Sequence, residues 1–355
     1  MRVFQNIRNG CILNFTMSQI FYSLKSIHQV IEKENPSQVC IVTSDILKKK
    51  LAWAIKEIGV SKSHIISVVN GEAVKEWNEI EKLLQKFVEL NLDRKSLIIA
   101  LGGGTIGDSV GFAASIYLRG IKYIQVPTTL LAQVDSSHGG KTGINFLGNK
   151  NQVGSFYPPL ATIIDTRFIG SLSKEQITEG LGEIIKAGCI REPLILSFLK
   201  KETLATLPHS KRLEGIIKKS IKVKEYYIKK DYKDNGLRQI LNVGHTLGHA
   251  LELKYKIGHG KAVLIGMLQE FEITERMGLT HRSVRKNLVL LLKSLGIEVD
   301  TSLKPDWKNI VRDKKVNKGS VVLPAVAREG RSSLIEIKLK DFREFIVFDS
   351  HMSIK

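Results

Sequence analysis

The sequence contains little cysteine: three residues among 355, placed far apart at Cys11, Cys40 and Cys189. No CxxC pair occurs, and the odd number argues against a disulfide framework. No apolar run approaches the ~20 residues that a membrane-spanning helix needs. The first ten residues, MRVFQNIRNG, also lack the apolar core of a signal peptide. These absences favour a reducing compartment and predict a cytoplasmic protein.

Acidic residues are scarce relative to basic ones, since 35 Asp and Glu stand against 54 Lys and Arg and give a net charge of +19. Such a charge occurs in proteins that bind nucleic acid or membrane surfaces. Here, however, the lysines are scattered in small groups along the whole chain, and no RNA motif with interleaved aromatic residues occurs. The charge fits a lysine-rich solvated surface or the attraction of an anionic substrate equally well.

The hydrophobic pattern predicts two domains. In the first half, short β-branched runs alternate with helical patterns such as Val74 to Leu90, which predicts a parallel sheet covered by helices. From about Leu172 to Leu295 helical periodicity dominates. The predicted strands are residues 38–43, 65–69, 96–101, 122–126 and 161–165, with a later strand pair at 321–324 and 334–337. We therefore predict an α/β domain over residues 1–170 and a mostly α-helical domain over residues 171–355.

One carboxylate and three imidazoles lie in short motifs of the second half. Glu183 is followed one helical turn later by Lys186, and His245 and His249 are four residues apart, which places them on one face of a helix. A carboxylate and two imidazoles form a ligand set for a catalytic zinc or a similar divalent ion. Nine histidines allow a chance pair, but the glycines beside His245, His249 and His259 permit close backbone approach and favour a metal site.

A glycine-rich turn follows the third predicted strand. Gly102, Gly104 and Gly107 form G-x-G-x-x-G, which permits a tight turn and the approach of a pyrophosphate to a helix N-terminus. The acidic residue expected about 20 positions later is absent, since residues 122–133 hold no Asp or Glu. The turn alone fits a structural loop as well as a dinucleotide site. Asp108 would be repelled by a phosphate, so we expect it to face a hydroxyl group.

A second glycine-rich segment, GGKTG at residues 139–143, ends like a Walker A loop but lacks its first glycine. A lysine on such a loop suits an anionic group, because its ammonium is a compact point charge with three donors. The segment therefore predicts an anion-binding loop.

Taken together, the motifs resemble the 3-dehydroquinate synthase family of sugar phosphate cyclases. In order from about Gly71 to Gly319 they are GGG-x-x-GD, PTTLLAQVDSS, GGKTG, E-x-x-K, R-x-x-LN-x-GH-x-x-x-H and HG. The resemblance implies an NAD-binding α/β domain (1–170) and a mostly helical metal- and substrate-binding domain (171–355). It implies a phosphate-eliminating carbon–oxygen lyase of the shikimate pathway. The implied reaction converts 3-deoxy-D-arabino-heptulosonate 7-phosphate to 3-dehydroquinate, with NAD and Zn²⁺ or Co²⁺.

The resemblance also assigns site residues. The implied metal ligands are Glu183, His245 and His259, so His249 is placed near the substrate phosphate instead. The implied catalytic and substrate positions are Arg119, Asp135, Lys141, Asn151, Lys186, Lys224, Asp234, Arg238, Asn242, His249 and Lys314. The implied NAD positions are Glu72, Lys75, Gly103, Gly104, Asp108, Thr128, Thr129, Lys141, Lys150 and Ser171. Arg119 matches an arginine that reaches the neighbouring subunit's site, which implies a homodimer without nucleic-acid or membrane partners.

The sequence departs from the family pattern at a few positions. The run from Thr43 to Ile46 lacks an Asp-x-Asn pair that contacts the NAD ribose, which predicts weaker NAD binding. Lys261, two residues after His259, stands where the family usually has Glu; it either lowers metal affinity or points to solvent. His138 stands where the family has Val or Ile, and Asp234 where it has Glu.

Three other functions compete with this interpretation. A sister cyclase would act on sedoheptulose 7-phosphate or glucose 6-phosphate, but Arg238 suits a carboxylate that those sugars lack. A metal-dependent alcohol or glycerol-phosphate dehydrogenase would consume NAD, whereas a cyclase regenerates it. A basic nucleic-acid binder would show salt-sensitive retention on DNA without turnover.

Overall fold

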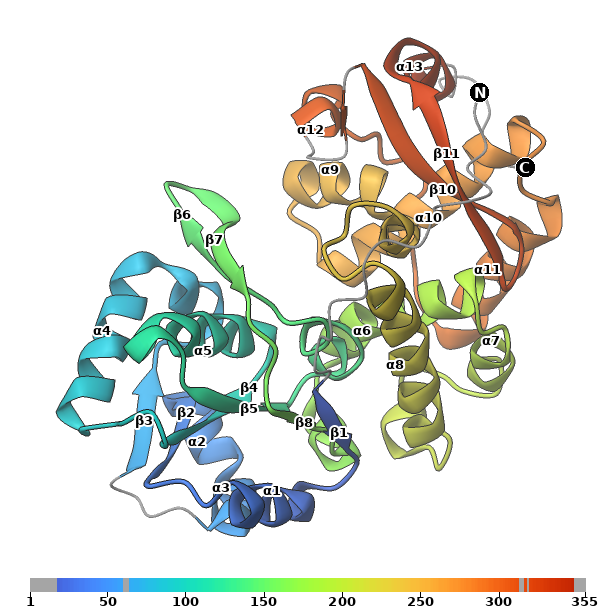
Figure 1. Cartoon of the computed structure of the whole chain (residues 1–355). Coiled ribbons are helices and arrows are strands. Elements are labelled where there is room, and N and C mark those ends of the chain that lie inside the picture. The colour runs from blue at the N-terminus through green and yellow to red at the C-terminus, as the bar shows by residue number, and fades with distance from the viewer. Residues whose placement is uncertain (1–17, 60–63, 313–315, 318, 348–355) are drawn as a thin grey trace. The chain divides into compact units, whose positions relative to one another are not determined.

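The computed structural model describes residues 18–59, 64–312, 316–317 and 319–347 (Figure 1). It divides into two compact units, one of which ends at Leu172 and the other of which begins at Ser173. Lys314 lies outside the described residues. In the described part of the chain, none of the helices combines the length and the apolar character that a membrane span requires.

The first unit is built on a six-stranded, all-parallel sheet with the order β1-β8-β5-β4-β2-β3. Its strands are β1 (Gln19–Phe21), β2 (Val39–Ser44), β3 (Ile65–Val68), β4 (Leu97–Gly102), β5 (Lys122–Pro127) and β8 (Ala161–Ile163). The five predicted strands correspond to β2, β3, β4, β5 and β8, with bounds within two residues. The three-residue edge strand β1 was not predicted, because so short a run carries no periodicity.

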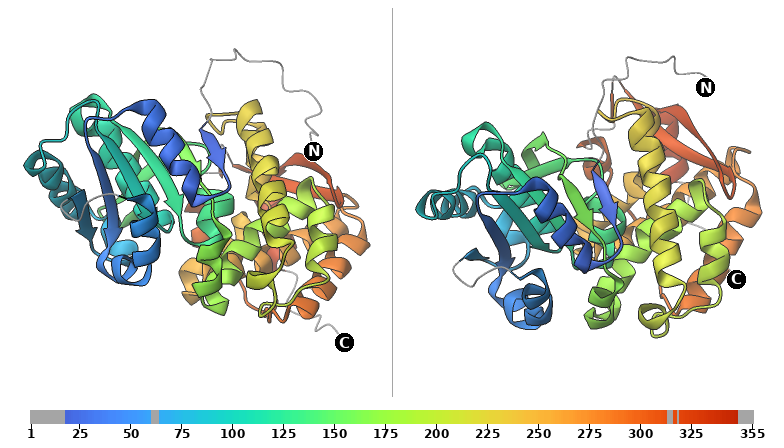
Figure 2. Two further views of the ribbon diagram at one scale, coloured as in Figure 1. Left: turned by 90° about the horizontal axis from the view of Figure 1, so that it is seen from below. Right: turned by 60° about the horizontal axis from the view of Figure 1, so that its bottom comes forward.

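Helices cover both faces of this sheet, as the views of Figure 2 show. One face packs against α1 (Ile27–Glu34) and α3 (Ala52–Ile58), and the other against α4 (Trp77–Glu89) and α5 (Gly104–Ile116). The short helix α2 (Asp45–Lys50) follows β2 directly. The prediction of an α/β fold is confirmed. The predicted helix from Val74 begins later, at Trp77, because residues 71–75 form the 3-10 helix η3 and Glu76 is extended.

An antiparallel hairpin extends the first unit. Its strands are β6 (Lys141–Phe146) and β7 (Asn149–Phe156), and both turn residues, Leu147 and Gly148, adopt positive φ angles of 49° and 76°. Such a turn is the type of connection that matches strand twist. The sequence predicted only a glycine-rich loop here; the structure shows that the loop leads straight into a strand.

The second unit is mostly helical, as predicted. Its helices are α6 (Lys174–Ile190), α7 (Leu194–Leu199), α8 (Leu213–Lys230), α9 (His245–Tyr255), α10 (His259–Arg276), α11 (Arg282–Leu295), α12 (Trp307–Arg312) and α13 (Leu339–Val347). The predicted strand pair is present but longer, as β10 (Ser320–Arg328) and β11 (Arg331–Lys338), with β9 (Val316–Asn317) on the other side of β10. The inner faces of β10 and β11 pack on Leu247 and Ala250 of α9.

Replacing Gly111 by Ala tests the packing of α5 on the sheet. A Cβ atom at Gly111 would lie 2.5 Å from Cγ2 of Thr142 and 2.8 Å from the hydroxyl of Tyr123. We expect overpacking to lower the free energy of unfolding by about 1–3 kcal/mol. Gly215→Ala on α8 is the matched control, since open space surrounds that position and the helix should gain about 0.5–1 kcal/mol. Urea unfolding followed by circular dichroism measures both, and equal midpoints would contradict the expectation.

Candidate active site

Three helices of the second unit approach one another closely because glycines line their contacts. A Cβ atom at Gly182 of α6 would lie 2.8 Å from Cα of Gly260 on α10, and one at Gly248 of α9 would lie 2.9 Å from the carbonyl oxygen of Ala262 on α10. No side chain fits at these distances, so glycine is required. Each of the three helices carries one of the implied metal ligands, and the close packing brings these ligands together.

The ligand atoms converge on one carboxylate oxygen. Nε2 of His245 lies 3.2 Å, and Nε2 of His259 3.3 Å, from Oε1 of Glu183. One ligand atom from each residue lies within 4.8 Å of the others, and Glu183 and His245 are buried. Two imidazole nitrogens and one carboxylate oxygen are the donor set of a catalytic zinc or cobalt site with an open position. The residues present therefore fit a divalent metal ion.

The other nitrogen of each imidazole is held by a separate acceptor. Nδ1 of His245 lies 3.1 Å from the carbonyl oxygen of Val243, and Nδ1 of His259 lies 3.3 Å from Oε2 of Glu252. When Nδ1 donates its proton to these oxygens, Nε2 of each ring carries the free lone pair. Partners of this kind fix the tautomer and ring orientation that a metal ligand needs.

The charges at the site are strongly perturbed. Burial, helped by the nearby Lys186 ammonium, lowers the pKa of His245 to about 3, so this imidazole is neutral. Burial opposes the charge of His259, but hydrogen bonds to Glu183 and Glu252 outweigh it and raise its pKa to about 10. For Glu183 burial favours the neutral acid, yet Lys186 and His245 hold its pKa well below the usual value. The site therefore keeps a buried carboxylate ionised.

Lys186 and His249 border the three ligands. The ammonium of Lys186 contacts Oε2 of Glu183, the oxygen that faces away from the histidines, and both side chains are buried. The ring of His249 lies 5.1 Å from that of His245 and 6.1 Å from that of His259, measured between centroids. His249 is not in the converging group, and its implied role near the substrate stays a prediction.

Anion-binding candidates gather on the segment that precedes α9. Arg238 and Asn242 belong to the 3-10 helix η8 (Leu237–Asn242), and the nearly buried Arg238 donates to the carbonyl oxygen of Tyr232 at 2.7 Å. Asp231 shapes this segment, because its carboxylate accepts the N–H groups of Gly236 at 2.7 Å and Arg238 at 3.1 Å. The turn between them contains Asp234, at φ 61°, and the half-buried Lys224 lies on α8.

In the first unit, the glycine-rich turn connects β4 to α5. Gly103 is the N-cap of α5, and a Cβ atom at Gly104 would lie 2.7 Å from Oγ of Ser136. The N–H of Thr128 donates to the carbonyl oxygen of Gly102 at 2.9 Å, so the segment after β5 runs beside the turn. Gly103 and Thr129 are also adjacent, with 3.2 Å between a built Cβ atom and the Thr129 methyl group. Backbone donors at a helix N-terminus beside the carboxyl ends of parallel strands form a phosphate cradle.

A buried lysine connects two groups of candidate residues. Lys75, 4% exposed, donates to the Asp108 carboxylate at 2.8 Å and to the side-chain oxygen of Asn151. Asn145 continues the network, since it donates to Glu72 at 2.9 Å and accepts the Asn151 N–H at 3.1 Å. Asp108 therefore faces an ammonium group here. Three implied NAD residues and one implied substrate residue thus form one connected cluster.

The remaining candidates of the first unit occupy separate positions. Lys141 begins β6 and Lys150 lies on β7, both exposed, and Asp135 lies in the π-helical turn of residues 132–136. Ser171 is used locally, because its hydroxyl donates to the carbonyl oxygen of Phe168 and its own carbonyl accepts from Lys50. Arg119 is exposed at the end of the turn after α5.

The departures from the family pattern have local explanations. Ser44 caps α2 and donates to Asn70 at 3.2 Å, while Ile46 is 59% exposed, so weaker NAD binding stays a prediction. His138 is buried and its Nε2 contacts the carbonyl oxygen of Gln133 at 2.8 Å. Two hydrogen bonds with Ser302 and, less strongly, the charge of Lys261 lower the pKa of the exposed Asp300. The Lys261 charge therefore acts on an exposed carboxylate, that of Asp300.

The sequence motifs did not identify Glu252, Asp231 or Asn145. Glu252 carried a usable signal, because it lies seven residues after His245 and hence on the same helix face. Asp231 and Asn145 act through backbone and amide hydrogen bonds in irregular segments, which leave no periodic trace in a sequence.

Substituting Glu183, or Glu252 beside His259, tests the metal site. We expect Glu252→Gln to weaken zinc affinity by about 10–100-fold, because it removes only the charged partner of a ligand. Glu183→Gln removes a ligand atom and should weaken it further. His281→Gln, at the N-cap of α11, is the control and should bind zinc normally. Competition with a chromophoric chelator measures all three; unchanged affinity in Glu183→Gln would exclude the assigned ligand.

Comparison with known proteins agrees with this geometry. Models of the 3-dehydroquinate synthase N-terminal and C-terminal regions match residues 65–179 and 180–316. The 3-dehydroquinate synthase of Dictyoglomus thermophilum is 42% identical, and the alignment covers 79% of this chain and 81% of that protein. The 3-dehydroquinate synthase of Streptococcus sanguinis is 36% identical, and the alignment covers 88% of this chain and 90% of that protein.

Among solved structures, 2-deoxy-scyllo-inosose synthase complexed with carbaglucose-6-phosphate, NAD⁺ and Co²⁺ aligns at a TM-score of 0.80. Its sequence is 25% identical, and the alignment covers 93% of this chain and 99% of that one. Because the two family models together span most of the chain and the motifs occupy both units, the chain belongs to the 3-dehydroquinate synthase family.

Proposed function

We propose that this protein is the 3-dehydroquinate synthase of its cell, a phosphate-eliminating lyase that converts 3-deoxy-D-arabino-heptulosonate 7-phosphate to 3-dehydroquinate and phosphate. The observation that carries the proposal is the convergence of Glu183, His245 and His259 on one point, in a chain 36–42% identical to curated synthases over most of its length. The sister cyclase with NAD⁺ and Co²⁺ supports the same two cofactors here.

The two cofactors have residues that fit them. Glu183, His245 and His259 would hold Zn²⁺ or Co²⁺, which when bound supplies a Lewis acid for vicinal hydroxyl groups. The turn at Gly103 and Gly104 with Thr128 and Thr129 would hold NAD, which when bound accepts a hydride and returns it within one turnover.

The side chains around the metal ligands bind and orient the substrate. Lys186 is held beside Glu183 in a buried setting, where an ammonium attracts an anionic oxygen more strongly than in water. Arg238 is 4% exposed, and its planar guanidinium suits a carboxylate. Val243 and Glu252 orient the two imidazoles through their Nδ1 atoms. His245 is neutral and presents a free Nε2, whereas His259, whose pKa is raised to about 10, releases a proton before its Nε2 can bind a metal ion.

The choice of substrate rests on Arg238. The principal alternative is a sister cyclase for a neutral sugar phosphate, since one such enzyme has the same fold. Arg238 is buried and already donates to the carbonyl oxygen of Tyr232. A substrate that carries a carboxylate as well as a phosphate offers its planar guanidinium a bidentate partner, whereas a sugar phosphate without a carboxylate offers only its phosphate.

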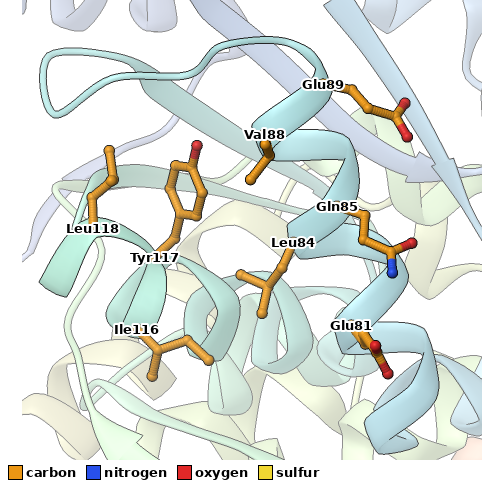
Figure 3. Close-up of a pocket in the computed structure, with 8 residues that line it drawn as sticks. All are labelled: Glu81, Leu84, Gln85, Val88, Glu89, Ile116, Tyr117 and Leu118. Carbon is orange, nitrogen blue, oxygen red and sulfur yellow. The ribbon is translucent and has the colours of Figure 1, made fainter.

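We also propose a homodimer in which Arg119 serves the partner subunit's site. A groove of about 620 Å³ lies between α4 and residues 116–118, the last of which directly precedes Arg119 in the sequence (Figure 3). Apolar side chains line it while remaining exposed, with Val88 at 62%, and Ile116 and Leu118 at 41% each. An exposed apolar surface of this kind favours contact with another protein surface, here a second copy.

The proposed enzyme acts in the cytoplasm. In the described part of the chain, Cys40 and Cys189 are buried free thiols, and burial raises the pKa of both. Unreactive thiols of this kind agree with a reducing compartment.

Phosphate release tests the activity. Purified protein given 3-deoxy-D-arabino-heptulosonate 7-phosphate and a trace of NAD should release far more phosphate than the NAD supplied, because the cofactor is regenerated. A chelator should abolish release, and Zn²⁺ or Co²⁺ should restore it. Release only from glucose 6-phosphate or sedoheptulose 7-phosphate would indicate a sister cyclase, and accumulation of NADH a dehydrogenase.

Mixing two inactive variants tests the dimer. Arg119→Ala and Lys186→Met should each lose activity alone, for lack of one substrate contact. If Arg119 acts across the dimer, co-expressed variants form mixed dimers with one intact site, and random pairing restores about a quarter of the wild-type activity. If Arg119 acts within its own subunit, mixing restores nothing.

A further inference from the structure

Both histidine ligands stand at the first residue of a helix. His245 begins α9 and His259 begins α10, and the N-cap residues are Gly244 and Gly258, which have no side chain to cap the helix. The first N–H groups of a helix have no partner within it. Each helix start therefore needs acceptors from elsewhere, and it presents a partial positive charge beside a site for a cation.

A buried glutamate of α10 caps the start of α9. Glu270 is fully buried, and its Oε2 accepts the N–H of Gly244 at 2.6 Å. Its Oε1 accepts the N–H groups of Thr246 at 3.0 Å and Leu247 at 3.2 Å. One carboxylate thus satisfies three backbone donors on both sides of His245. It is held there by the close approach of the two helices, since a Cβ atom at Gly266 would lie 2.7 Å from the Gly248 nitrogen.

A second glutamate, from α6, caps the start of α10. Oε2 of Glu179 accepts the N–H of Gly260 at 2.8 Å, and the same carboxylate lies against Gly258, where a Cβ atom would clash with Oε1 of Glu179. Glu179 is one turn before the ligand Glu183 on α6. The starts of α9 and α10, which carry His245 and His259, are therefore each capped by a carboxylate from a neighbouring helix.

We propose that Glu179 and Glu270 are positioning residues for the metal site. Their hydrogen bonds to the helix starts fix the backbone positions from which the side chains of His245 and His259 extend. Their charges offset the positive ends of both helices, so that the site accepts a divalent cation. The negative charges reduce the repulsion between the cation and the helix ends. Glu179 also supplies a carboxylate close to His259.

This inference rests on the metal site of the proposed function, but its first test needs no substrate. Glu179→Gln and Glu270→Gln keep an acceptor oxygen and lose the charge. We expect each to weaken binding of Zn²⁺ and of Co²⁺ by about 3–30-fold, measured by chelator competition on the full chain. Glu275→Gln is the control: it lies on α10, pairs with Arg285 at the partly exposed surface, and should bind both ions normally.

A second measurement separates positioning from a merely structural role. The rise in unfolding temperature that saturating zinc produces should shrink in both variants, because that rise reports metal affinity. With metal at saturation, kcat for phosphate release should recover towards the wild-type value. If Glu270→Gln does not fold, Glu179→Gln, whose site is less deeply buried, decides alone.

The outcomes are distinct. Metal affinity within twofold of the wild type in the folded variants, with only a lower unfolding temperature, would reduce both glutamates to structural caps and overturn the inference. Failure of the wild-type protein itself to bind zinc or cobalt would instead overturn the metal site and the proposed function with it.

Discussion

The geometry of the second unit depends on the close approach of α6, α9 and α10. Glycines at positions such as 182, 248 and 260 let backbone meet backbone, and this spacing brings Glu183 between two imidazoles that come from different helices. Any Cβ atom at these contacts would push the helices apart, and a shift of about 1 Å already costs catalytic geometry heavily. The glycines are therefore part of the site, although none of them has a side chain that could bind anything.

Close packing also creates an electrostatic problem. It buries Glu183 and Glu270 among helices, and a buried carboxylate is costly unless it is paired or hydrogen-bonded. Each of the two has a compensation of its own: Glu183 has the ammonium of Lys186, and Glu270 has three backbone N–H groups. The negative charges are thus maintained without solvent. A cation that enters meets a preformed set of donors and pays little reorganisation.

Much of this could be predicted from the sequence, and the limits have physical reasons. The strands β2, β4 and β5 were evident because fully buried strands are continuous apolar runs. The motifs singled out Glu183 and three histidines, but only the family resemblance favoured His259 over His249 as a ligand. The hairpin β6–β7 was missed because its second strand is largely exposed and polar, and such a strand lacks the apolar run by which a buried strand is recognised. Glu179 and Glu270 were missed because their partners are backbone groups of other helices. Such contacts depend on helix packing, which a single sequence does not encode as a pattern.

The first unit also contains a buried charge that is compensated by neighbouring groups, but there the charge is positive. There the buried ionic group is the ammonium of Lys75, which is compensated by the Asp108 carboxylate and the Asn151 amide. Asp108 lies on the helix that follows the glycine-rich turn, and Asn151 lies on the β6–β7 hairpin, so one lysine connects this helix to the hairpin. A change at Lys75 would remove the buried ammonium that pairs with the half-buried Asp108 carboxylate, and the loss of such a partly desolvated pair costs more than the loss of an exposed one. The lysine therefore links the position of the hairpin to that of the glycine-rich turn, which explains why residues of two implied roles form one hydrogen-bonded cluster.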